Sequence, residues 1–149
     1  MLDLSAATGN LAVKLYSFEI KKQLSFSNLR EAFFQAVSNS SWAHEGYLVA
    51  ADISTDEDFI AELRRLSASF GIGIIRLEID DPDSSEVLIS ARERAALDWD
   101  TLNKLAMNKD VQDLLTRIKN DLQTKEIIKE KYDKILQRED LLKSIRRKK

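Results

Sequence analysis

Cysteine is absent from the 149 residues of this chain, which excludes disulfide bonds and thiolate metal sites and fits a reducing compartment. The four glycines form no phosphate-binding loop, because the run Phe70-Gly-Ile-Gly-Ile lies inside an expected strand and lacks a third glycine before a helix. The two glycines of this run are expected to permit close backbone approach instead. The single histidine, His44, has no catalytic arrangement around it, so we expect a structural or rim role.

Long apolar runs are also lacking: none approaches the roughly 18 residues that a membrane span needs, and the N-terminus has no signal-peptide pattern. We therefore expect a cytoplasmic protein with no membrane partner. Neither sign of charge dominates, since 23 basic residues face 25 acidic ones, for a net charge of −2. Any contact with nucleic acid must come from a local patch. The length and the 44% hydrophobic fraction are typical of one globular domain.

The stretch from Leu15 to Lys22, LYSFEIKK, is predicted to form a short buried strand that begins soon after the first methionine. Successive side chains of a strand point to opposite faces. One face would carry Ser17, Glu19 and Lys21, and the other would carry Tyr16, Phe18 and Ile20. We expect the apolar trio to face a core. An acid and an amine then lie side by side on the other face.

Two interpretations of Glu19 and Lys21 are open. In the first they are half of a metal-dependent nuclease site, where the carboxylate holds a hard divalent cation and the lysine steadies an attacking water and the charge on phosphate. In the second they form an ordinary salt bridge. An acid and a lysine two residues apart are common by chance in a chain with 32% charged residues.

Apolar patterning after this strand alternates between the helical and the extended period. The expected elements are a helix over 28–38, a strand over 46–51, a helix over 56–69, a strand over 71–79 and a short edge strand over 87–89. Strand and helix in alternation with short loops predict parallel crossover connections. The fold class is therefore α/β, with a mixed sheet flanked by helices.

Everything from Asp98 onward is expected to be helical, with a short helix over 98–107 and an apolar stripe over 110–138. One continuous helix of that length would overrun a small domain and pack against a second copy, giving a homodimer. The alternative is a helical hairpin that breaks near Gln123-Thr124. The basic tail over 145–149 could contact phosphate or be a solvated end. We place a domain boundary between an α/β core, 1–107, and a helical extension, 108–149.

The runs that begin at Leu15, Phe26 (FSNLREAFFQAVSNSSWAHEGYLVA), Ser67 (SASFGIGII) and Leu97 resemble the bacterial HrgA-type restriction-endonuclease-like proteins. The likeness covers roughly residues 11–107. These proteins are similar in turn to the PD-(D/E)xK nuclease superfamily, and they resemble its Mrr-like members most. The resemblance implies a restriction-endonuclease-like fold and metal-dependent hydrolysis of DNA.

Carried over by position, the resemblance makes Glu19 the second carboxylate of the site and Lys21 its lysine, with the Ile20 carbonyl as a further metal contact. Gln35 matches the glutamine that some branches use to orient the lysine or the water. The first carboxylate, an Asp that follows a proline, has no counterpart here, because Asp3 is the only acid upstream. We expect a preceding portion that is missing or supplied elsewhere. Mg²⁺ or Mn²⁺ should then bind weakly or not at all in this chain.

The resemblance thus implies a DNA endonuclease of restriction or defence type that is inactive or incomplete as it stands. The competing hypothesis is a non-catalytic module that binds DNA or protein and dimerises through its C-terminal helix, with Glu19 and Lys21 merely paired.

Overall fold

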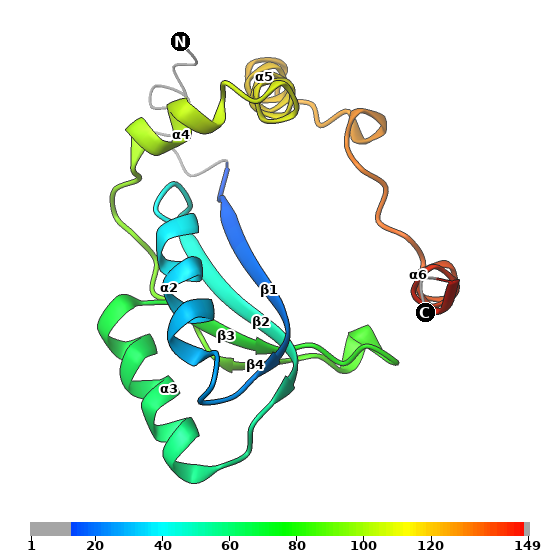
Figure 1. Ribbon diagram of the computed structural model, residues 1–149. Helices are drawn as coiled ribbons and strands as arrows, with labels where there is room; N and C mark the ends of the chain where they lie inside the picture. Colours follow the sequence, from blue (N-terminus) through cyan, green and yellow to red (C-terminus); the bar gives the residue numbers. More distant parts are fainter. Residues whose placement is uncertain (1–12, 148–149) are drawn as a thin grey trace. The chain divides into compact units, whose positions relative to one another are not determined.

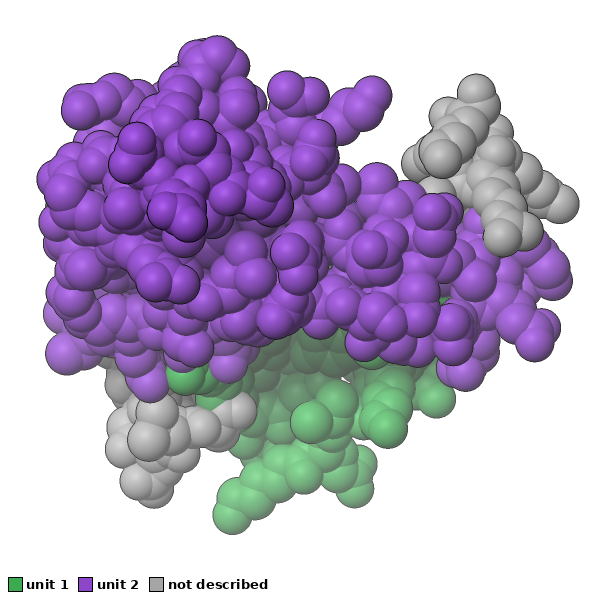
Figure 2. All heavy atoms as spheres, turned by 90° about the horizontal axis from the view of Figure 1, so that it is seen from below, with its two compact units in different colours: residues 1–14, 98–136 green, residues 15–97, 137–149 purple. Residues whose placement is uncertain are grey.

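The structure is a computed structural model that describes residues 13–147, with side chains described as far as residue 144. It divides into two compact units (Figure 2). The sheet unit comprises residues 15–97 and 137–149, and the helical unit comprises residues 1–14 and 98–136. The predicted boundary at 107/108 stays a prediction.

The sheet unit alternates strands with helices, as the apolar pattern predicts (Figure 1). Its elements are β1 (Tyr16–Leu24), α2 (Leu29–Asn39), β2 (Glu45–Ile53), α3 (Glu57–Phe70), β3 (Gly73–Arg76), a 3-10 turn (Pro82–Ser84), β4 (Glu86–Ile89) and α6 (Arg138–Arg147). The strand order is β1-β2-β3-β4; the first three strands are parallel and β4 is antiparallel to β3. The α/β class and the mixed sheet are confirmed.

Helices α2 and α3 lie on the same side of the sheet (Figure 1). Two successive crossovers that step in the same direction along a sheet place their helices on one face, because such connections are right-handed. The core lies between these helices and the strands. Its central buried side chains are Leu29, Phe33, Phe59, Leu63, Leu48, Ala50 and Ile74. We call this side of the sheet the covered face.

Tyr16, Phe18 and Ile20 of β1 point away from that core, so the expectation that they face a core is wrong; Leu24, at the end of the strand, is the β1 side chain that joins the core. Tyr16, Phe18 and Ile20 are 44%, 55% and 65% exposed, whereas Ser17 on the other face is 8% exposed. The physical reason is that both crossover helices cover the opposite face. There the neighbouring strand β2 supplies the apolar contacts, through Leu48 and Ala50.

The side of the sheet opposite the helices is here called the open face. The strand register places on it Tyr16, Phe18 and Ile20 of β1, Tyr47 and Val49 of β2, Ile75 of β3 and Val87 of β4. The rings of Tyr16 and Phe18 stack at 6.4 Å between centroids, and those of Phe18 and Tyr47 at 5.9 Å. A Cβ on Gly73 would lie 2.3 Å from the Tyr47 ring and 2.7 Å from the Ala91 nitrogen. The predicted close approach at this glycine is confirmed.

The helical unit contains α4 (Trp99–Leu105), α5 (Lys109–Thr124) and a 3-10 turn (Lys129–Lys131). The alternative of one continuous helix over 110–138 is wrong, because α5 ends at Thr124 and Lys125 adopts a left-handed conformation with φ 58°. The predicted break near Gln123-Thr124 is confirmed, but the helical hairpin and the expectation that everything after Asp98 is helical are wrong, because residues 125–137 contain only the 3-10 turn. The carboxylate of Asp121, in the last turn of α5, accepts hydrogen bonds from the Ile128 nitrogen and the Tyr132 hydroxyl beyond the break. These bonds stabilise the turn that follows the helix.

Helix α6 belongs to the sheet unit, where Arg138 forms an ion pair with Asp81 at 2.6 Å. The basic tail over 145–149 lies outside the residues whose side chains are described, as does Asp3. No helix in the described part of the chain is both long and apolar enough to span a membrane.

Candidate functional site

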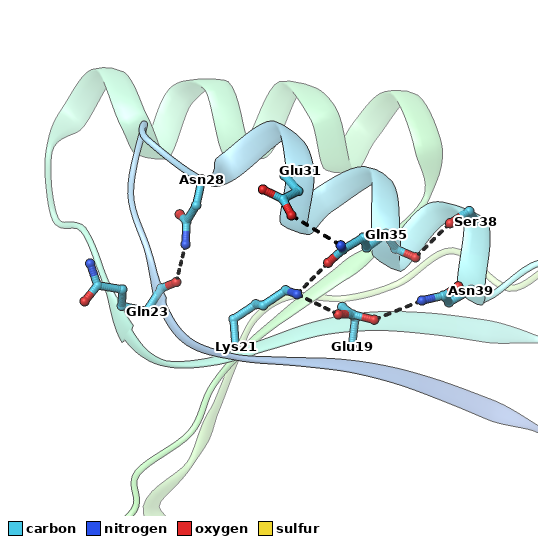
Figure 3. A network of polar contacts seen from close by, with 8 residues as sticks. All are labelled: Glu19, Lys21, Gln23, Asn28, Glu31, Gln35, Ser38 and Asn39. Carbon is cyan, nitrogen blue, oxygen red and sulfur yellow. Dashed lines mark hydrogen bonds and ion pairs between the residues drawn. The ribbon is translucent and has the colours of Figure 1, made fainter.

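Glu19 and Lys21 lie next to each other on the covered face, where β1 passes beneath α2 (Figure 3). The Lys21 ammonium is 2.9 Å from Oε1 of Glu19. Both side chains keep access to solvent, at 19% exposed for Glu19 and 29% for Lys21. The pair is therefore half-buried, and a ligand can still reach it.

Helix α2 presents three polar side chains to this pair, each four residues from the next, so they lie on one side of the helix. Gln35 accepts a hydrogen bond from the Lys21 ammonium through Oε1. Asn39 donates through Nδ2 to Oε2 of Glu19 at 3.1 Å. The amide of Gln35 donates in turn to Oε1 of Glu31 at 3.5 Å. We call these five side chains the polar network.

The end of α2 is held to β1 by a second bond, in which the Ser17 hydroxyl donates to the Asn39 carbonyl at 3.1 Å. Ser17 is buried on the covered face, two residues before Glu19 and on the same side of β1. The bond fixes the last turn of the helix against the strand. As a result the Asn39 amide is held over Glu19.

The network favours the charged form of Glu19. The hydrogen bond from Lys21 lowers the pKa of this carboxyl below its ordinary value of 4.5, and the Asn39 bond adds to the effect, although partial burial acts in the opposite direction. Glu19 is thus a carboxylate at neutral pH. It offers negative charge at the surface between β1 and α2.

The residues present do not by themselves complete a metal site. No group of three or more His, Cys, Asp or Glu side chains that could hold an ion occurs among the described residues. Glu19 contributes one carboxylate, and Ile20, whose side chain lies on the open face, could contribute only its carbonyl. Glu31 is joined to Glu19 only through Gln35 and Lys21. Mg²⁺ would need phosphate oxygens and water for the rest of its shell.

His44 and Arg94 have structural roles near the start of β1. The Nδ1 atom of His44 accepts a hydrogen bond from the Leu15 nitrogen at 2.9 Å, which confirms the predicted structural role. Arg94 donates to the carbonyls of Ser40 and Ala43, at 3.0 and 3.2 Å. Arg94 also donates to the Ser40 hydroxyl at 3.0 Å, and sequence reasoning did not identify this arginine because these partners lie more than fifty residues away. Together the two side chains fix the loop between α2 and β2.

The helical unit contains a cavity of about 740 Å³. Its lining is mainly apolar and comes from the second half of α5, the turn after it and the N-terminal segment. The lining residues are Val13, Ile118, Asp121, Leu122, Gln123, Lys125, Ile127 and Tyr132. Within this lining, Oδ2 of Asp121 accepts hydrogen bonds from the Ile128 nitrogen and the Tyr132 hydroxyl.

Comparison of the chain with models of protein families, with curated proteins and with solved structures found no match. The resemblance to restriction-endonuclease-like proteins therefore stays a prediction. The residues of the polar network are argued below from their geometry.

Proposed function

We propose that the polar network is the phosphate-facing half of a metal-dependent DNA endonuclease site of the restriction-endonuclease-like type. The observation that carries this proposal is that the Lys21 ammonium contacts both Glu19 and Gln35 on a half-buried surface. A lysine placed in this way can neutralise a phosphodiester without losing its position. Glu19 beside it supplies the anionic oxygen that a hard divalent cation prefers.

Each residue has a separate role in this proposal. Lys21 binds and neutralises a phosphate oxygen. Gln35 orients the lysine, and Asn39 orients Glu19. With a single carboxylate in place, binding of Mg²⁺ or Mn²⁺ should be weak without DNA and stronger with it. We therefore expect DNA binding that Mg²⁺ strengthens, together with trace cleavage at most.

Glu19→Gln tests the proposal, because it keeps the shape of the side chain and removes its charge. The Kd for a DNA duplex would be measured by fluorescence anisotropy with and without Mg²⁺, alongside nicking of a supercoiled plasmid in Mg²⁺ or Mn²⁺. We expect Glu19→Gln to abolish the gain in affinity that Mg²⁺ brings, and any nicking with it. Glu57→Gln, an exposed acid on α3, is the matched control. The same Mg²⁺ dependence in both variants would refute the assignment of Glu19.

The second candidate is a non-catalytic binding module. It is favoured by the direct Glu19–Lys21 ion pair and by the absence of an ion-holding cluster among the described residues. Here the network would only hold α2 on β1. DNA affinity that ignores Mg²⁺, with no nicking in either metal, would support this candidate over the nuclease.

A further inference from the structure

The open face is an apolar surface on a kind of sheet that normally has none. Sheets of parallel strands occur almost only with both faces covered. Here β1, β2 and β3 are parallel, yet α2 and α3 both lie on the covered face. Phe18 and Ile20 are each more than half exposed, and Val87 on β4 is 54% exposed. A contiguous patch of this kind marks an interaction surface.

The aromatic side chains of the open face lie with their rings nearly parallel to one another. The rings of Tyr16, Phe18 and Tyr47 stack within 16° and 21° of parallel, and Gly73 leaves room for the Tyr47 ring to lie against β3. An exposed apolar face of a sheet suits packing against the face of a second sheet. Two sheets pack face to face about 10 Å apart in this way.

Charge on the open face is confined to its two ends. Strand alternation places Lys22, which is exposed, beyond Ile20 at the end of β1. Glu45 stands at the start of β2, opposite Tyr16 in the register, and accepts a bond from the Tyr47 hydroxyl at 2.8 Å. A two-fold axis perpendicular to the strands, lying between the two sheets, places the end of β1 in one copy over the start of β1 in the other copy. Lys22 of each copy then approaches Glu45 of the other.

We propose that the open face is the interface between two copies of this chain. The apolar side chains of the two faces interdigitate, and the Lys22–Glu45 contacts form twice at the rim. This arrangement is isologous, so it closes as a dimer and does not propagate. The proposal is independent of the proposed function, because the polar network lies on the other face and needs no second copy.

The test is sedimentation of the full chain and its variants over a range of micromolar concentrations. We expect a dimer for the unmodified protein and a dimer Kd about thirtyfold or more weaker for Phe18→Asp, which puts a charge into the middle of the interface. Phe18 is exposed in the single chain, so the variant should keep its fold, as thermal unfolding at low concentration would verify. Arg64→Glu on the exposed side of α3 is a matched control that should leave the Kd unchanged.

A charge exchange identifies the geometry of the interface. Lys22→Glu and Glu45→Lys should each weaken the dimer about tenfold, and the double variant should restore it. Leu114→Asp on α5 separates this surface from a dimer held by the helical unit and should have no effect. A chain that stays monomeric at high micromolar concentration would overturn the proposal. So would a dimer that Leu114→Asp dissociates and Phe18→Asp does not.

Discussion

The covered face and the open face are built from the same strands, yet they differ in what β1 contributes. On the covered face β1 places polar side chains under α2, and β2 and β3 supply the core with Leu48, Ala50 and Ile74. On the open face β1 supplies the most exposed apolar side chains of the sheet. Because β1 is an edge strand that contributes to the core mainly through Leu24 at its end, the covered side of its middle can hold a charged pair. The difference shows why a cluster of polar side chains can lie beneath a helix of the core.

The largest effect is expected on the free energy of unfolding, where alanine substitutions of two phenylalanines, one on each face of the sheet, should differ most. Phe33 is fully buried on the covered face, whereas Phe18 is 55% exposed on the open face. Phe33→Ala should lower the free energy of unfolding by about 3–5 kcal/mol, through lost burial and the cavity it leaves. Phe18→Ala should change it by only about 0.5 kcal/mol. Urea denaturation at low micromolar concentration, where dimers contribute little, measures both values. Equal losses would mean that the open face is covered within the single chain.

A smaller effect should appear in the titration of Glu19. The Lys21 bond is the largest cause of its lowered pKa, so Lys21→Ala should raise this pKa toward 4.5, and Asn39→Ala should raise it less. A carboxyl with a lowered pKa in the folded state stabilises the fold above its unfolded pKa. That stability is lost as the pH falls below 4.5 and through the folded value. Carbon NMR of the side-chain carboxyls would follow the titration. An unchanged Glu19 pKa in Lys21→Ala would show that the pair does not form in solution.

Periodicity alone predicts the order of the strands and helices from β1 to β4, but it does not predict α6 as a separate helix of the sheet unit. It also placed Glu19 and Lys21 on one face of β1, and the structure brings both together with Gln35. It could not decide which face of β1 is covered, because alternation is symmetric. That choice depends on the handedness of two crossovers and on the apolar side chains of β2, which are distant in sequence.

Two members of the polar network, Glu31 and Asn39, were not predicted. Their signal is their spacing of four residues on either side of Gln35, which becomes informative only once the α2 side facing β1 is known. The sequence also left open whether the helix over 110–138 continues or breaks near Gln123-Thr124. The apolar stripe continues past Thr124, whereas the bonds of Asp121 that stabilise the turn are tertiary contacts.

The adjacent lysines of β1 provide the most direct test that the polar network binds phosphate. Lys21 lies on the covered face within the network, and Lys22 lies on the open face. The measurement is the affinity for a DNA duplex as a function of salt, for Lys21→Ala and Lys22→Ala in parallel. We predict that Lys21→Ala weakens binding and lowers the slope of log K against log salt by about 1. Measured at a protein concentration too low for the proposed dimer, so that the rim contact of Lys22 plays no part, Lys22→Ala should leave both unchanged. Equal losses in the two variants would contradict the account, because they would reduce the role of Lys21 to nonspecific positive charge.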